Sequence, residues 1–233
     1  MQNRLLAALT PADYGLVAPH LTHLDLERGR LLYDPGDLID TVYFPHDGVI
    51  SLLTLMESGA AIESATIGRE GALGLTAAVA PRQSLSRAIV QTPCRAARIS
   101  AVQLHEAWER SPRIRVLVDN HTEALFGHAA QSVACNALHS VEARFCRWLL
   151  TCRDRISTDT VALTQEFLAD MLGVQRTTVT AVARTLQARG YIRYRRGVVD
   201  ILDRAGLEAM ACECYGVVRR TYERLLPAPV GEA

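Results

Sequence analysis

The feature that most constrains the fold is the stretch of residues 163–180, which reads as two short helices joined by a tight turn. Thr164 is placed to cap the first helix. Gly173 supplies the backbone freedom that the turn needs, and a second helix begins near Gln175. Apolar residues lie on only one side of each helix. This pattern predicts a helix-turn-helix whose second helix leaves a polar face free, as in proteins that enter the major groove of DNA.

A β-hairpin is predicted directly after the two helices, over residues 191–202. Apolar and polar residues alternate there on both sides of Arg196-Gly197, a pair suited to a two-residue turn. Six arginines and no acidic residue lie from Gln175 to Arg196. Guanidinium groups bind phosphate oxygens well, so this segment predicts a nucleic-acid surface. The residues expected to contact DNA are Thr164, Gln175, Arg176, Thr177, Thr178, Thr180, Arg184, Arg193, Arg195 and Arg196.

The charge of the chain is divided unevenly, although the formal net charge is zero. Residues 1–138 hold 11 arginines and 14 acids, and residues 139–233 hold 14 arginines and 11 acids. The basic half is therefore the half that carries the helix-turn-helix, which agrees with a DNA-binding role.

The first half of the chain changes from strands to helices. Residues 22–100 contain short apolar segments about ten residues apart with frequent turn signals, which indicates an antiparallel sandwich or barrel, with a short internal helix within residues 68–80. Residues 101–110 predict one helix. Ser111-Pro112 then begins a long one.

A 4,3 spacing along the long helix is typical of a seam between two helices. It predicts a dimer; the alternative is a helix packed on its own sheet. Within the seam, His121 and His128 are seven residues apart. This spacing fits either a pair of core or interface histidines or two side chains that share a ligand or a metal. The residues expected at the dimer contact are Ile114, Val118, His121, Leu125, His128 and Ser132.

The six cysteines predict reduced thiols, because the chain is large and begins without a secretion signal. Cys212-Glu213-Cys214 is a weak metal motif without matching partners in the sequence. We therefore expect no metal site and no cofactor. No apolar run is long enough to span a membrane, so we expect a cytoplasmic protein that does not bind membranes.

These segments together resemble the Crp/Fnr family of bacterial transcription regulators, most closely over residues 163–202. The resemblance implies an α+β fold with a cupin-like antiparallel β-roll, a central dimerisation helix and a winged helix-turn-helix. We assign residues 1–110 to the sensor roll, 111–138 to the helix and 139–233 to the DNA-binding domain. The implied function is regulation of transcription by a homodimer bound to a pseudo-palindromic operator. RNA polymerase and a small-molecule effector are further partners that the resemblance allows.

The effector pocket departs from the family's cyclic-nucleotide pattern. The part of the family's motif that contains its Gly-Glu pair is still present, within residues 67–74. Ser84-Leu85, however, stands where the family has an Arg-Ser or Arg-Thr step that clamps the cyclic phosphate. We therefore expect a regulator that cyclic AMP does not control. The alternative is a cyclic-nucleotide or cyclic-di-GMP response through a rearranged phosphate site. The cysteine cluster of the family's oxygen sensors is missing, since Cys94 is the first cysteine. The candidate pocket residues are Gly68, Arg69, Glu70, Gly71, Ser84 and Arg87.

Two other classes of protein compete with this interpretation. The winged domain could contact protein in place of DNA, but the arginine-rich segment argues against that. The chain could also be an enzyme, because β-rolls house metal oxygenases and isomerases. Such a site needs clustered ligands, and the roll offers only His23 and His46, far apart in the sequence, so we predict that the chain is not an enzyme.

Overall fold

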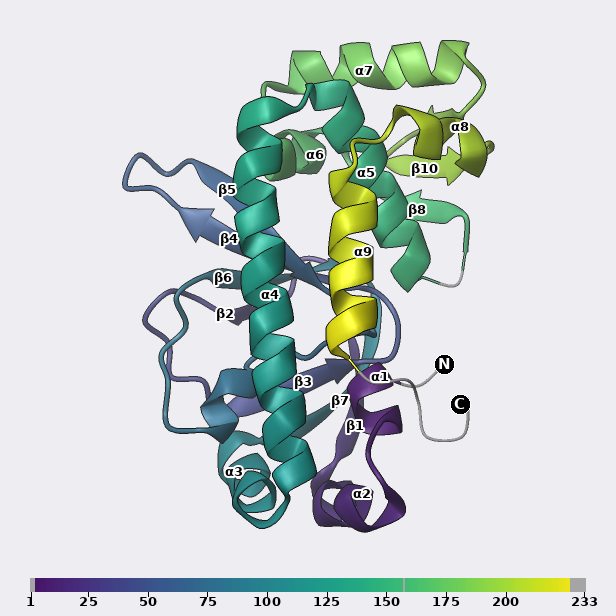
Figure 1. Ribbon diagram of the computed structural model, residues 1–233. Helices are drawn as coiled ribbons and strands as arrows, with labels where there is room; N and C mark the ends of the chain where they lie inside the picture. The colour runs from purple at the N-terminus through teal and green to yellow at the C-terminus, as the bar shows by residue number, and fades with distance from the viewer. Residues whose placement is uncertain (1–2, 157, 227–233) are drawn as a thin grey trace.

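The structure is a computed structural model that describes residues 3–156 and 158–226. The chain begins with α1 (Arg4–Ala7), α2 (Pro11–Val17) and the 3₁₀ turn η1 (Ala18–His20). The predicted cap of α2 is present, because the Thr10 hydroxyl accepts the backbone N–H of Asp13 at 3.2 Å. These short helices close one end of the β-roll (Figure 1).

The roll consists of two antiparallel sheets with the strand orders β1-β7-β3 and β2-β6-β4-β5. In Figure 1 both sheets lie behind the long helix α4 (Pro112–Leu138). The predicted internal helix is only the 3₁₀ turn η2 (Leu75–Ala78). The strands are β1 (Thr22–Leu26), β2 (Leu31–Tyr33), β3 (Thr41–Pro45), β4 (Val49–Leu55), β5 (Ala61–Ile67), β6 (Arg87–Thr92) and β7 (Cys94–Ser100).

Two helices follow the roll at the predicted positions. Ser100 caps α3 (Ala101–Arg110), and Ser111 caps α4 (Pro112–Leu138) by accepting the backbone N–H of Ile114 at 3.1 Å. Pro112 occupies the first turn of α4, where its missing N–H costs no hydrogen bond. α4 then runs along most of the molecule (Figure 1). Among the described residues, no helix is both long and apolar enough to cross a membrane.

The face of α4 that carries the 4,3 pattern packs inside the same chain. Leu125 is half-buried there, and the other five predicted contact residues are at most 5% exposed. Their neighbours are the roll and the C-terminal helix, since Ile114 and Val118 share a core cluster with Phe44 and Tyr222. These six positions are therefore not a free surface for a second copy, which corrects the expectation for Ile114, Val118, His121, Leu125, His128 and Ser132. The alternative, a helix packed on its own sheet, describes this face.

The basic half of the chain forms a winged helix-turn-helix at the far end of α4 from α2 (Figure 1). Its small sheet has the order β8-β10-β9, and β8 is a strand that the sequence interpretation did not include. The elements are α5 (Val141–Arg155), β8 (Thr160–Ala162), α6 (Gln165–Leu172), α7 (Arg176–Ala188), β9 (Ile192–Arg195), β10 (Val198–Ile201) and α8 (Arg204–Met210).

The last helix, α9 (Cys214–Leu225), lies alongside α4 (Figure 1). Tyr222 and Leu226 belong to the core that also contains Leu5 and Ile114, so the chain returns from the winged domain to the roll. This differs from the expectation that residues 139–233 all belong to the DNA-binding domain. The difference arises because the apolar face of α9 packs against α4.

Candidate nucleic-acid interface and junction pocket

The turn between α6 and α7 has the geometry of a helix-turn-helix. Gly173 ends α6 in the left-handed conformation with φ 62°, which a residue with a Cβ adopts only at a cost. Thr164 caps α6 by accepting the backbone N–H of Phe167 at 3.3 Å. The buried face of α7 holds it on the domain through Val179, Ala183 and Leu186, each at most 1% exposed. The remaining face of α7 is left to solvent.

The polar residues predicted on the two helices lie on that outer face or at its border, apart from Thr164, which is the N-cap of α6. The exposed ones are Thr164, Gln175, Arg176, Thr177 and Arg184, and the half-buried ones are Thr178 and Thr180. Thr180 fastens α7 to α6, because its hydroxyl donates to Gln165 Oε1 at 2.8 Å. Gln175 is the N-cap residue, so Arg176 and Thr177 begin the helix where its positive dipole end faces solvent.

The hairpin after α7 turns at Arg196-Gly197, as predicted. Both residues have positive φ, 46° and 79°, as a two-residue turn between twisted strands requires. Arg193 and Arg195 are 52% and 68% exposed, and each lies 3.4 Å from Asp200 Oδ2. The Thr160 hydroxyl and these two guanidinium groups hold the pKa of Asp200 below its usual value. One carboxylate shared at long range leaves both arginines able to contact phosphate.

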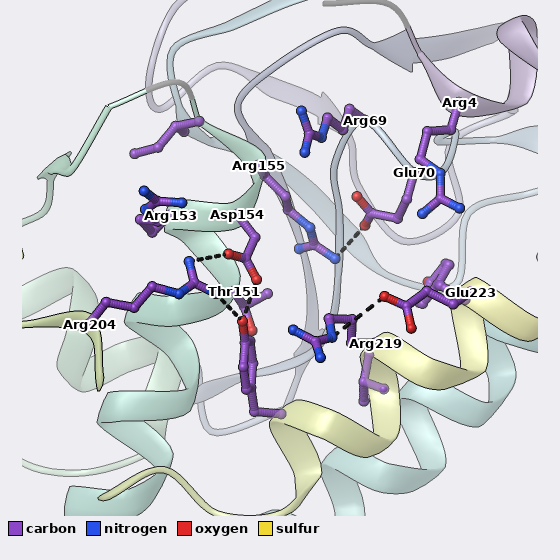
Figure 2. A pocket seen from close by; sticks show the side chains of 14 residues that line it. Arg4, Arg69, Glu70, Thr151, Arg153, Asp154, Arg155, Arg204, Arg219 and Glu223 are labelled. Atoms are coloured by element: carbon purple, nitrogen blue, oxygen red, sulfur yellow. Dashed lines mark hydrogen bonds and ion pairs between the residues drawn. The ribbon is translucent and has the colours of Figure 1, made fainter. Parts of the chain in front are cut away.

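A cavity of about 500 Å³ lies at the junction between the roll, α5 and α9 (Figure 2). Six arginines and three carboxylates line it, and two of these arginines have a further carboxylate partner outside the lining, Asp159 for Arg153 and Glu208 for Arg204. The charged lining residues are Arg4, Arg69, Glu70, Arg153, Asp154, Arg155, Arg204, Arg219 and Glu223.

The innermost contact of this junction pocket is an ion pair between the roll and the winged domain. Arg155 of α5 is 6% exposed, and its Nη2 lies 2.5 Å from Glu70 Oε1 (Figure 2). The same guanidinium donates to the hydroxyl and carbonyl of Thr66. Burial lowers the pKa of Arg155, but the charge of Glu70, its hydrogen bond and the neighbouring Tyr222 and Cys152 together outweigh burial, and the pKa is raised. Arg155 therefore stays charged and ties α5 to the roll.

The six candidate pocket residues fall into two separately bonded groups. The Gly68 N–H donates to Glu70 at 3.2 Å, while Arg69 lines the junction pocket beside Glu70. A Cβ on Gly71 would stand 2.7 Å from His121 Nε2, so α4 packs closely against this turn. In the other group, both nitrogens of the Arg87 fork bind Asp34, at 2.7 and 2.8 Å.

Ser84 belongs to the second group, since its hydroxyl donates to the Ser86 carbonyl at 2.7 Å. Glu70 and Arg87 thus have different ionic partners, Arg155 and Asp34.

The two histidines of α4 are core residues with separate partners. His121 Nε2 accepts the backbone N–H of Ala72 at 3.2 Å, and burial lowers its pKa to about 4. His128 stacks edge-on against Tyr222, and burial lowers its pKa well below the usual value. Both are therefore neutral at pH 7, and of the two alternatives weighed for them, the core pair describes what the structure shows.

The two histidines of the roll, far apart in the sequence, come together in the fold. His46 Nε2 lies 3.3 Å from His23 Nδ1, and the rings stack. Within the described residues, however, the groups of three or more side chains able to hold a metal do not include this pair.

Comparison with known proteins agrees with this architecture. Residues 23–111 match the model of the cyclic nucleotide-binding domain, and residues 143–210 match the model of the Crp-like helix-turn-helix domain. The chain belongs to the Crp/Fnr family. It is accordingly a DNA-binding transcription regulator of the Crp/Fnr type with an α+β fold.

Individual relatives are distant. The global nitrogen regulator of Nostoc sp. is 22% identical over 185 residues, which cover 75% of this chain and 82% of the relative. The structure of FixK2 from Bradyrhizobium japonicum has a TM-score of 0.70 at 16% identity, covering 82% of this chain and 98% of that one. The c-di-GMP-responsive global regulator CLP from Xanthomonas campestris has a TM-score of 0.65 at 18% identity, covering 83% and 100%. At these identities the structural matches support the fold alone.

Proposed function

We propose that the protein acts in the cytoplasm as a homodimer that binds a pseudo-palindromic operator without cyclic AMP. Residues 1–110 are its sensor roll, 111–138 its connecting helix, and the residues from 139 to the end of α8 its DNA-binding domain. The observation that carries the proposal is the exposed N-terminal turn of α7, with Arg176 beside a basic wing in the same domain. RNA polymerase is a further partner that we propose on the strength of the family.

Within this interface, we propose that Arg176 reads guanine and that the wing arginines hold phosphate. An exposed guanidinium at the start of the recognition helix can bind the O6 and N7 acceptors of guanine in the major groove. Thr177 and Thr180 are short, so they fit close to the base edges or the backbone. Thr164 acts through its cap on α6 and by presenting the helix terminus to phosphate.

The dimer contact that we propose is the outer face of α4. Four large apolar residues of α4 are exposed, and one of them, Leu138 at 79%, is the last residue of the helix. The other three are Val116 at 55%, Phe126 at 76% and Val133 at 72%. They are ten and seven residues apart, which places them on one stripe with the period of a coiled coil. An exposed apolar stripe on a long helix costs solubility unless it is covered, and a second copy of α4 covers it with the same residues.

Sedimentation velocity tests this contact. We expect a dimer at micromolar concentration that becomes a monomer when Phe126→Glu and Val133→Glu are combined, because two charges would then be buried. Val102→Glu is the matched control, since Val102 is an exposed valine on α3, 69% accessible. A dimer that survives the double variant would exclude this face.

We propose further that the junction pocket takes an anionic small molecule. Its arginine-rich lining favours an anion, and a ligand that bound Arg155 would compete with the ion pair between Arg155 and Glu70 that joins the two domains. Such a ligand would act through its different affinity for the paired and unpaired arrangements.

Calorimetry separates this proposal from control by a cyclic nucleotide. We expect no micromolar binding of cyclic AMP, cyclic GMP or cyclic di-GMP. Micromolar binding that Arg87→Ala abolishes, together with an operator affinity that depends on the nucleotide, would instead establish the rearranged phosphate site.

A further inference from the structure

Three cysteines and one histidine from distant parts of the chain meet where α4 ends. The nearest ligand atoms of Cys135, His139, Cys212 and Cys214 all lie within 4.8 Å of one another. The separations include 3.5 Å between the sulfurs of Cys135 and Cys212, and 3.5 Å from Cys214 Sγ to His139 Nδ1. We propose that these four side chains form a tetrahedral site for one thiophilic metal ion, zinc.

The dimensions of this Cys3His cluster fit one ion. With zinc bonds of about 2.3 Å to sulfur and about 2.0 Å to nitrogen, a tetrahedron has ligand atoms about 3.7 Å apart. An iron–sulfur cluster of two or more irons spreads its ligands over several metal atoms, so its cysteine sulfurs cannot all lie this close. Three thiolates and an imidazole select zinc over the hard cations calcium and magnesium, which prefer oxygen.

The orientation of His139 is a second, independent indication. Its Nδ1 faces the sulfurs, while its Nε2 lies 3.0 Å from Glu213 Oε2. Histidines that bind metals almost always donate their other ring N–H to a carboxylate or carbonyl, which holds the ring in place. Gln131 Nε2 also donates to Cys214 Sγ at 3.0 Å, as an outer partner of a thiolate would.

Burial and charge complete the site. The three cysteines are at most 7% exposed, so their thiolates would be costly without a cation. One zinc ion leaves the four ligands with a net charge of −1. The buried Arg144 interacts electrostatically with Cys135 and Cys212, while its own hydrogen bonds go to neutral oxygens of Asn136 and Leu172. Arg147, also buried, interacts electrostatically with Cys135 and Cys212 as well, so two guanidinium groups beside the cluster offset that negative charge.

The place of the Cys3His cluster suggests what the metal does. Cys135 lies in the last turn of α4 and His139 is its C-cap, while Cys212 lies between α8 and α9 and Cys214 begins α9. A metal there joins the end of the long helix to the segment that leaves the DNA-binding domain. It would therefore hold the winged domain in a fixed position on α4.

Metal analysis of the full chain tests the proposal. We expect about one zinc ion per chain after purification with zinc and treatment with a weak chelator. Replacing zinc by cobalt should give the intense visible bands and the thiolate charge-transfer bands of a tetrahedral site. Cys212→Ser and Cys214→Ser should each lower zinc retention at least tenfold. Cys94→Ser is the matched control, since Cys94 is a buried thiol of β7 outside the cluster.

The cobalt spectrum of the unaltered chain keeps the test valid if a serine variant fails to fold. Absence of zinc together with an octahedral or absent cobalt spectrum would overturn the proposal. It would also fail if mass spectrometry showed a Cys135–Cys212 disulfide in the protein purified under reducing conditions, or if Cys94→Ser lost zinc as fully as Cys212→Ser. Hydrogen exchange gives the location: removing zinc should speed exchange in residues 131–139 and 212–218. Unchanged exchange there would place the metal elsewhere.

Discussion

Arginines gather in two regions of this protein, and the two groups differ in what neutralises them. In the junction pocket, Arg155 is 6% exposed and pairs with Glu70, and Arg204 pairs with Asp154 and Glu208. On α7 and the wing, Arg176 and Arg196 are exposed, and two further arginines share the single carboxylate of Asp200.

The difference follows from the cost of burying a charge. A guanidinium taken out of water requires a partner within the protein, whereas an exposed one remains solvated until a ligand arrives. The same residue type therefore joins two domains at one end of the winged domain and offers charge to DNA at the other. In the sequence the two groups of arginines look alike, and they are distinguished only by how deeply the fold buries them.

The largest expected effect comes from breaking the junction pair. Arg155→Met should lower the free energy of unfolding by about 3–5 kcal/mol, because Glu70 would remain buried without its partner. Urea denaturation at pH 7 measures this. The control is Arg195→Met on the wing, which removes an exposed pair with Asp200 and should leave the free energy of unfolding nearly unchanged. Equal losses in the two variants would remove the distinction between the regions.

A second junction contact should make stability depend on pH. Glu63 of the roll accepts the Trp148 indole N–H of α5 at 3.0 Å, and burial raises the pKa of Glu63 to about 7. The protonated form is favoured in the folded state, so its stabilisation is complete below the unfolded pKa and is lost as pH rises through 7. Glu63→Gln mimics that form.

The difference in free energy of unfolding between wild type and Glu63→Gln isolates the effect of Glu63. The histidines of α4 cancel in this difference, and their lowered pKa values change stability with pH in the opposite direction. Between pH 5 and 8, the free energy of unfolding of wild type should fall by on the order of 2–3 kcal/mol relative to that of the variant. Urea denaturation at each pH measures this. A difference that stays flat would mean that Glu63 is ionised throughout.

At the DNA end, Arg176→Ala should reduce the preference for the operator over scrambled DNA by about 1–3 kcal/mol, because a guanine contact is lost. Fluorescence anisotropy with both DNAs gives the ratio. Arg189→Ala is the control, since Arg189 is exposed at the opposite end of α7. If Arg176→Ala kept the full preference, Arg176 would not read bases.

The smallest effect is expected at the wing. Arg196→Asn keeps the turn, because Asn tolerates positive φ, and removes one phosphate contact. It should weaken binding to all sequences alike and lower the slope of log affinity against log salt by about 0.9. An altered sequence preference at constant slope would assign Arg196 to base reading.

Much of the fold could be predicted because its signals are local. Ser111-Pro112 and Thr164 mark helix starts with side chains that bond to their own turn, and Arg196-Gly197 marks the wing by its φ angles. The features that sequence reasoning missed all depend on distant partners. The 4,3 pattern of α4 marks the most apolar face of the helix. In this fold that face is buried against the roll and α9 of the same chain, so it is not left for a second copy. The stripe through Phe126 is less apolar overall and gives a weaker pattern.

The Cys3His cluster shows the same limit. Cys135 and His139 are one helical turn apart, which is a usable ligand spacing, but the sequence separates them from Cys212 by more than seventy residues. Only the return of α9 along α4 brings the two halves together. Likewise, no residue near Glu70 in the sequence predicts that Arg155 is its ionic partner.

The central claim is that the exposed arginine surface binds a specific operator with no added nucleotide. The most direct test is to select the operator from random DNA with the purified protein alone and to measure its affinity against scrambled DNA at physiological salt. We expect a preference for the operator over scrambled DNA of at least about 10³-fold without any cyclic nucleotide. Equal affinity for both DNAs, or a preference that arises only when a cyclic nucleotide is added, would contradict it.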